Sequence, residues 1–162
     1  MSDSIDGDRF RKVLGCVPTC VTVVTAMDGD EPVAMVIGSF GSVSLDPPLV
    51  EFMPGTSSST WPRIERAGSF CVNVMGADQL DVCNAFFTKQ EDPFSIHEWQ
   101  VSDTSGAPRL AGSAAWIDCD IDQVVEAGDH YIVIGRVLEL DGDPDRDPLV
   151  FHHGAYGSFR EL

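Results

Sequence analysis

The feature that most constrains the fold is a recurring pattern of short runs rich in β-branched residues, each ended by a turn signal. Residues 20–27 form one such run, Asp28-Gly29-Asp30 marks a turn, and residues 32–37 form the next run. The same pattern predicts further strands at residues 41–43, 49–53, 70–75, 114–121, 131–140 and 149–152. Many short strands with few helices are typical of a barrel or sandwich, so a mainly β barrel with helical insertions is expected.

Helical patterns occupy only a few short segments. Phe10 and Leu14 share one face of a helix predicted over residues 8–14. The hydroxyl residues and proline within residues 57–62 are typical of a helix start. A third helix is predicted over residues 78–87, where apolar residues recur at helical spacing.

The charge of the chain excludes two classes of partner. Ten basic residues against 26 acidic residues give a formal net charge of −16. Such a surface repels phosphate backbones and anionic lipid headgroups, so neither nucleic acid nor a membrane is expected as a partner. No repeat or linker divides the 162 residues. A single domain is therefore predicted over residues 1–162, with residues 1–8 as a flexible tail.

The sequence carries no sign of export. Residues 1–8 are polar and acidic, unlike a signal peptide, and no stretch approaches the ~20 apolar residues of a membrane helix. The five cysteines are an odd number, which favours reduced thiols and a cytoplasmic location.

No residue pattern predicts a protein nucleophile, a general base or a metal site. The sequence has no G-x-S-x-G elbow, no P-loop and no G-x-G-x-x-G after a strand. His97, His130, His152 and His153 lack metal-ligand spacing. Because neighbouring side chains on a strand point to opposite faces, His152 and His153 are not expected to share an ion.

A hydroxyl-rich loop is the first candidate for ligand binding. Residues 57–60 read Ser-Ser-Ser-Thr and open a predicted helix, so their hydroxyls and backbone N–H groups can bind an anion. Arg63 and Arg66 are expected to add positive charge. The alternative is plain helix capping.

Two glycine-containing segments are further candidates. Residues 38–42 read Gly-Ser-Phe-Gly-Ser, and glycines in a strand allow a flat ligand to approach, although a β-bulge explains them equally well. The turn Gly128-Asp129-His130 places an imidazole at a barrel rim, where Asp129 can orient it. The alternative is a structural or solvated histidine.

The order of these segments resembles the short-chain flavin reductase family. The stretch over residues 39–50, Ser-Phe-Gly-Ser-Val-Ser-Leu-Asp-Pro-Pro-Leu-Val, and the Gly128-Asp129-His130 turn carry the specific part of the likeness. Further matching stretches lie at residues 14–25, 59–62, 70–74, 106–110 and 135–137. The likeness covers nearly the whole chain, from Phe10 to about Phe159.

The resemblance implies an FMN-binding split barrel of the Greek-key type that forms a homodimer. Such proteins reduce FMN or FAD with NADH or NADPH, and the reduced flavin diffuses to a partner monooxygenase. The hydride then passes directly between the two cofactors, so no protein nucleophile is needed, and the sequence predicts none. By the same resemblance, the flavin ring lies against Val36, Ile37, Gly38, Ser39, Ser42, Val43, Ser44, Asp46 and Pro47, the phosphate lies at Ser57, Ser58, Ser59, Thr60 and Trp61, and His130, with Asp129, positions the nicotinamide.

Several residues depart from the family pattern. Val36, Gly38 and Gly41 stand where relatives commonly carry hydroxyls, and Cys20 stands where glycine is usual. Glu51 lies in a strand near the expected site, where a carboxylate repels a phosphate unless it points away. The missing hydroxyls keep open a second function, a non-catalytic protein that binds flavin for electron transfer or storage.

Overall fold

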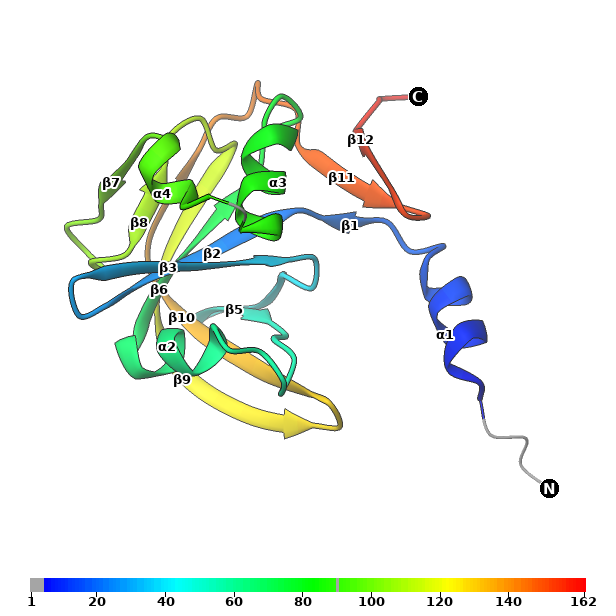
Figure 1. Ribbon diagram of the computed structural model, residues 1–162, viewed down its shortest axis with the longest axis horizontal. Coiled ribbons are helices and arrows are strands. Elements are labelled where there is room, and N and C mark those ends of the chain that lie inside the picture. The colour runs from blue at the N-terminus through cyan, green and yellow to red at the C-terminus, as the bar shows by residue number, and fades with distance from the viewer. Residues whose placement is uncertain (1–4, 90) are drawn as a thin grey trace.

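The computed structural model describes residues 5–89 and 91–162 and shows a mainly β protein (Figure 1). Its body is a seven-stranded antiparallel sheet with the strand order β3-β2-β6-β9-β10-β5-β4. Short strands with one buried face favour this antiparallel arrangement. The strands are β2 (Thr22–Asp28), β3 (Glu31–Ile37), β4 (Gly41–Leu45), β5 (Pro48–Phe52), β6 (Ser69–Val74), β9 (Ala115–Ala127) and β10 (His130–Gly142).

The long hairpin of β9 and β10 joins the two halves of this sheet. The two strands pair along their whole length, from His130 opposite Ala127 to Gly142 opposite Ala115. On its other edge β9 pairs with β6, and on its other edge β10 pairs with β5. A Cβ atom built on Gly135 would lie 2.5 Å from the ring of Phe70. A glycine at this position therefore lets Phe70 fill the core beneath the hairpin.

Two small sheets lie beside the body. The first has the order β1-β11-β12, with β1 (Thr19–Cys20), β11 (Leu149–His152) and β12 (Ala155–Ser158). The second pairs β7 (Trp99–Val101) with β8 (Pro108–Leu110). Asn73 of β6 fastens β8 to the body, because its Oδ1 accepts from the Leu110 N–H at 2.8 Å and its Nδ2 donates to the Val23 carbonyl at 3.1 Å.

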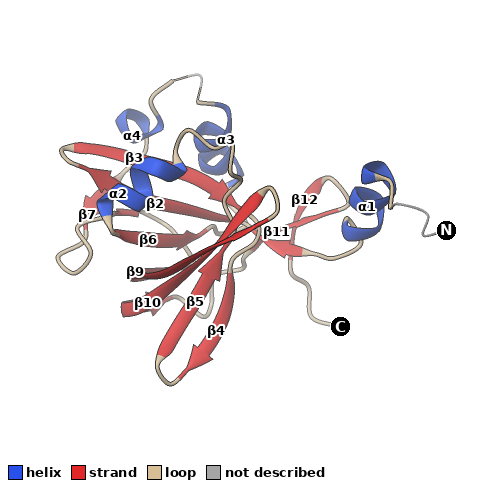
Figure 2. Ribbon diagram, turned by 90° about the horizontal axis from the view of Figure 1, so that it is seen from below, coloured by secondary structure: helices blue, strands red, loops and turns tan. Residues whose placement is uncertain are grey.

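Four helices accompany the sheets in the described part of the chain: α1 (Gly7–Leu14), α2 (Trp61–Ala67), α3 (Leu80–Thr88) and α4 (Pro93–Ile96). Trp61 and Ile64 bury one face of α2, which ends at Gly68 in the left-handed region with φ of 77°. Every residue of α1 is exposed, and the helix stands away from the body (Figure 2). None of these helices is long and apolar enough to cross a membrane.

Two clusters of buried side chains form the core. One fills the body of the sheet around Phe52, Trp61 and Phe70. The other lies beneath α3 and includes Met75 and Phe86. The edge-to-face contacts of Phe52 with Trp61 and Phe70, at centroid distances of 5.9 and 5.1 Å, fix α2 against the strands.

The predicted strands and the three predicted helices are present, with shifted ends. Both strands of the β9–β10 hairpin are longer than the runs predicted at residues 114–121 and 131–140. Helix α1 begins at Gly7 with Asp6 as its N-cap, so residues 7 and 8 are helical. Flexibility of residues 1–8 stays a prediction, and residues 1–4 lie outside the described part. The sequence did not predict α4, β7, β8 or β12, since each is only three or four residues long and too short to show a period.

Candidate functional site

A groove of about 1160 Å³ lies between the body and α1. Its walls come from the end of β3, the segment that follows β5, the tip of the β9–β10 hairpin and one side of α1. The lining includes Val36, Ile37, Gly38, Ser39, Met53, Pro54, Gly55, Asp129 and His130. The fold thus brings the predicted start of the flavin site together with the predicted nicotinamide residues, although the chain separates them widely.

The Ser39 hydroxyl joins two walls of the groove. Its Oγ accepts a hydrogen bond from the Met53 backbone N–H at 2.9 Å. This bond holds the end of β3 against the segment that follows β5. Ser39 therefore has a structural role, and its backbone remains the part that can face a ligand.

The hairpin tip is anchored on the same segment. The Thr56 N–H donates to the Asp129 carbonyl at 2.9 Å, the Thr56 hydroxyl donates to the same oxygen at 3.1 Å, and the Tyr131 N–H donates to the Pro54 carbonyl at 2.9 Å. Gly128 makes the turn with φ of 67°. These bonds fix the position of His130 relative to the segment that follows β5.

The imidazole of His130 is oriented by its neighbour. Its Nδ1 lies 2.8 Å from Oδ1 of Asp129, and the side chain is 51% exposed. This hydrogen bond and the nearby imidazole charge lower the pKa of Asp129. A Cβ atom built on Gly55 would lie 4.0 Å from Nε2 of His130. Nε2 therefore borders the groove beside Gly55 and can contact a ligand there.

Crowding explains one of the departures from the family pattern. A Cβ atom at Gly38 would lie 3.3 Å from Oγ1 of Thr19, so a serine there would press on β1. Glu51 is not among the residues that line the groove, and its Oε1 lies 3.9 Å from where a Cβ atom of Gly41 would be. The predicted repulsion between Glu51 and a phosphate does not arise within this groove.

Another group of predicted flavin residues lies elsewhere. They belong to β4 and the turn to β5, at the outer edge of the sheet (Figure 2). The groove lining does not include Ser42, Val43, Ser44, Asp46 or Pro47. Their contact with flavin stays a prediction.

The hydroxyl loop contains one hydroxyl that binds backbone and two that are exposed. Ser58 Oγ accepts from the N–H groups of Thr60 and Trp61 at 3.2 and 3.1 Å and so holds the loop against the start of α2, whose N-cap is Thr60. Ser57 and Ser59 are exposed. The indole of Trp61 is only 2% exposed and packs in the core, so any contact with a ligand comes from its backbone.

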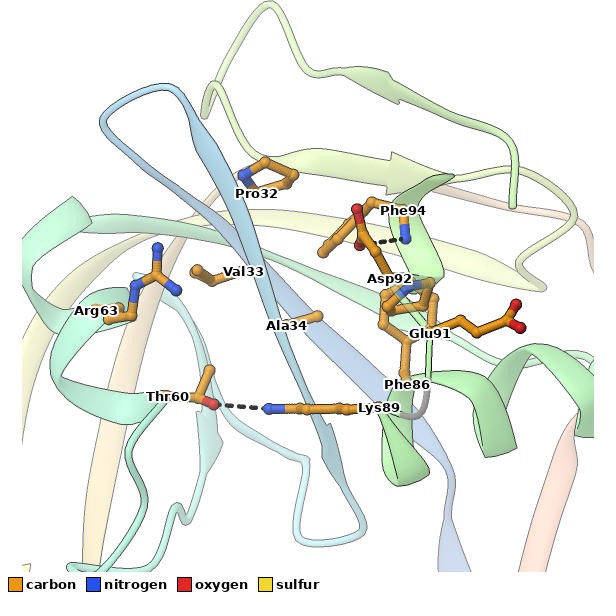
Figure 3. Close-up of a pocket in the computed structure, with 11 residues that line it drawn as sticks. Pro32, Val33, Ala34, Thr60, Arg63, Phe86, Lys89, Glu91, Asp92 and Phe94 are labelled. Carbon is orange, nitrogen blue, oxygen red and sulfur yellow. Dashed lines mark hydrogen bonds between the residues drawn. The ribbon is translucent and has the colours of Figure 1, made fainter. Parts of the chain in front are cut away.

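The positive charge at this loop comes from a residue that the sequence analysis missed. The Lys89 ammonium group, just after α3, donates to Oγ1 of Thr60 at 2.9 Å (Figure 3). Among residues 5–89 and 91–162, no carboxylate pairs with Lys89. A single lysine at a helix end gives no motif, so only the tertiary structure shows its place.

The expectation that Arg63 and Arg66 add net positive charge to the loop is wrong. Both guanidinium groups bind Asp28, at 2.7 and 2.6 Å, and Arg63 also binds Glu31 at 2.6 Å. These carboxylates come from the β2–β3 hairpin. Arg63 still borders a cavity beside Thr60, but its charge is compensated.

The histidine pair at the end of β11 also differs from expectation. His153 has φ of 51° and lies beyond the strand, and its ring centroid is 4.1 Å from that of His152. The two rings therefore do not point to opposite faces. Within the described residues, no group of three or more His, Cys, Asp or Glu side chains is arranged to hold a metal.

Comparison with known proteins agrees with this arrangement. Residues 14–160 match the family model described as "Flavin reductase like domain". A flavin reductase of Pseudomonas putida is 54% identical over 160 residues, covering 98% of this chain and 94% of that protein. The reductase subunit HsaB of a flavin-dependent monooxygenase from Rhodococcus jostii is 42% identical, covering 96% of this chain and 79% of that protein.

A solved structure extends the likeness to three dimensions. The Streptomyces globisporus NADH:FAD oxidoreductase SgcE6, in complex with NAD and FAD fragments, superimposes with a TM-score of 0.90 at 35% identity, covering 98% of each chain. The fold class expected from the sequence is thereby confirmed. On the family match and these relatives, the chain belongs to the flavin reductase-like family.

Proposed function

We propose that this protein is an NAD(P)H:flavin reductase that supplies reduced FMN or FAD to a separate monooxygenase. The observation that carries the proposal is one groove that is lined both by the end of β3 and by His130. One surface suits a flat ring because Gly38 presents backbone, and another presents the imidazole of His130 beside Gly55. The relatives named as a flavin reductase and as a monooxygenase reductase subunit support it.

The protein positions the two rings. When bound, the nicotinamide supplies a hydride and the flavin accepts it. Backbone groups of Gly38 and Ser39 form the floor, and the Ser39–Met53 hydrogen bond keeps that floor rigid. Nε2 of His130 hydrogen-bonds the nicotinamide carboxamide, held in orientation by Asp129. No side chain is asked to transfer a proton.

The flavin phosphate is held at the start of α2. Ser57, Ser59 and Thr60 offer hydroxyls, and Lys89 offers the charge. An ammonium group that already donates to Thr60 can share a phosphate oxygen with it. In a chain of net charge −16, this local positive charge is the feature that permits an anionic cofactor to bind.

We further propose a homodimer that covers α1. Phe10, Val13 and Leu14 are 55%, 57% and 47% exposed, and Phe10 and Leu14 line the groove. An exposed apolar helix face beside a binding groove is typical of an interface. A second copy seated on α1 would enclose the groove from its open side. The five free thiols fit a cytoplasmic protein.

Anaerobic turnover tests the proposed activity. Purified protein is mixed with NADH or NADPH and free FMN or FAD, and the flavin absorbance is followed. Bleaching over many turnovers that depends on free flavin is expected. A single co-purifying flavin that neither nucleotide reduces would instead establish the second function, a non-catalytic flavin-binding protein, which the missing hydroxyls at Val36 and Gly38 favour.

A further inference from the structure

Helix α1 is a basic element in an acidic protein. It contains Arg9, Arg11 and Lys12 against the single carboxylate of Asp8, whereas the whole chain has ten basic and 26 acidic residues. All of its residues are exposed, and it stands away from the body (Figure 2). A local excess of positive charge of this kind attracts anions to the helix.

One face of α1 borders the groove. The helix residues that line it recur at intervals of three and four and therefore share a face: Gly7, Phe10, Arg11 and Leu14. The other two basic residues of the helix, Arg9 and Lys12, do not line the groove. The fold thus brings one of the three cations of α1 to the binding site.

Arg11 supplies a charge that no other lining residue provides. Among the described residues that line the groove, the other ionisable side chains are Asp129 and His130, which are hydrogen-bonded to each other. Five guanidinium groups of the body bind carboxylates instead, those of Arg63, Arg66, Arg109, Arg136 and Arg146. An anion in the groove therefore has Arg11 as its permanently charged partner.

The present partner of Arg11 holds it only weakly. Its Nη1 lies 3.0 Å from Oδ1 of Asp8, one turn earlier on the same helix, and the two side chains are 79% and 90% exposed. Exposed pairs at this spacing contribute little to stability. A guanidinium has five N–H donors, and the bond to Asp8 uses one of them. The remaining donors suit bidentate binding of a phosphate.

We propose that Arg11 binds the pyrophosphate of the nicotinamide dinucleotide, which makes α1 part of the site for the hydride donor. The inference rests on the proposed function, which places the nicotinamide at His130 in the same groove. A single ribose separates the ring from the pyrophosphate in that dinucleotide. The flavin phosphate has a cation of its own in Lys89 beside Thr60, and neither of these residues lines the groove.

The first test compares Arg11→Met with Arg9→Met, which removes the same charge from the same helix outside the groove. Arg11→Met is expected to raise the KM for NADH roughly threefold to fivefold with little change in kcat, the scale of one lost exposed charge contact. Calorimetric titration of NAD⁺ into the flavin-loaded protein should show the same loss of affinity. Arg11→Lys should recover part of it, and Arg9→Met should change neither value. Equal losses in Arg11→Met and Arg9→Met would overturn the assignment.

A hydride donor without a phosphate separates binding from structure. Dihydronicotinamide riboside carries the same ring and no pyrophosphate, so its KM should be the same in the wild-type protein and in Arg11→Met. The KM for NADH should also rise more steeply with salt concentration in the wild-type protein than in Arg11→Met, because salt screens the contact. A KM that rises for the riboside as well would show a structural effect of the substitution and contradict the proposal.

Removal of the competing carboxylate should have the opposite effect. Asp8→Asn releases the guanidinium of Arg11 and is expected to lower the KM for NADH roughly twofold. The same substitution added to Arg11→Met should have a smaller effect, since its partner is gone. An equal change in both backgrounds would show a general effect of charge rather than a contact made by Arg11.

The outcomes distinguish this inference from the function beneath it. If the wild-type protein reduces flavin with NADH and Arg11→Met has an unchanged KM, only the assignment of Arg11 is lost. If the wild-type protein turns over no flavin, the proposed function and this inference are lost together. If Arg11→Met lowers flavin affinity and leaves NADH affinity unchanged, Arg11 serves the flavin and the inference is overturned.

Discussion

The ammonium group of Lys89 lies 2.9 Å from the hydroxyl of Thr60 and joins the end of α3 to the start of α2. Lys89→Met should weaken flavin binding by about 2 kcal/mol, because hydrogen bonds to charged groups contribute roughly 1.5–3 kcal/mol. Flavin titration at low salt measures the change. Lys12→Met, which removes the same charge from exposed α1, serves as the control, and equal losses in both variants would contradict a phosphate site at Lys89.

The hydroxyl loop should separate into structural and binding residues. Ser58→Ala removes the acceptor of the Thr60 and Trp61 N–H groups and is expected to lower the free energy of unfolding by about 1 kcal/mol. The double variant Ser59→Ala with Thr60→Ala is expected to weaken flavin binding by about 1–3 kcal/mol. Urea unfolding and flavin titration measure the two effects. Unchanged flavin affinity in the double variant would remove the phosphate from this loop.

A buried ion pair should dominate the stability of the β7–β8 side. The Asp118 side chain is fully buried and binds Arg109, Ser102 and Ser105, and the Arg109 guanidinium lies 3.4 Å above the Trp116 ring. Arg109→Met leaves that carboxylate uncompensated and should cost about 3–5 kcal/mol in urea unfolding.

The surface pair Arg136–Asp122 provides the matched comparison. Arg136→Met removes an exposed guanidinium that binds Asp122 at 2.5 Å, and it should cost no more than about 1 kcal/mol. Similar losses in Arg109→Met and Arg136→Met would show that burial of Asp118 is not what makes its pair important.

Acid stability should depend on Asp28. Hydrogen bonds from Arg66 and Arg63 lower the pKa of Asp28 from 3.8 to about 2. A carboxyl group with a lower pKa in the folded state stabilises it fully above about pH 4, and this contribution is lost as the pH falls through about 2. Asp28→Asn should therefore lower stability at pH 5 and flatten its decline between pH 4 and pH 2, measured by urea unfolding. A decline as steep as in the Asp30→Asn control would refute this assignment.

The strands and turns could be predicted from local signals, but the ionic contacts could not. Runs of β-branched residues on either side of a turn signal identified β2 and β3, and the glycine of the Gly128-Asp129-His130 segment marked the later turn. Arg63 and Asp28 are 35 residues apart in the chain. Local spacing therefore linked Arg63 to the anion-binding loop and could not show that its guanidinium binds Asp28.

The candidate site depended on the order of its segments rather than on any one motif. The groove unites residues 36–39 with Asp129 and His130, as the family resemblance implies, whereas residues 42–47 lie beyond it. Lys89 was missed because its partner Thr60 lies 29 residues earlier, just before another helix. Contacts between side chains that are far apart in the sequence form only in the folded protein, so the local spacing of residues does not predict them.

The most direct test of the shared groove is the steady-state kinetics of His130→Ala with NADH, beside a flavin titration of the same variant. If Nε2 of His130 holds the nicotinamide, the KM for NADH should rise roughly fivefold to tenfold, the scale of one lost hydrogen bond, while flavin affinity stays unchanged. His152→Ala, away from the groove, should leave both values as they are. Unchanged NADH kinetics in His130→Ala, or an equal loss of flavin binding, would contradict a groove in which His130 faces the nicotinamide across from the flavin.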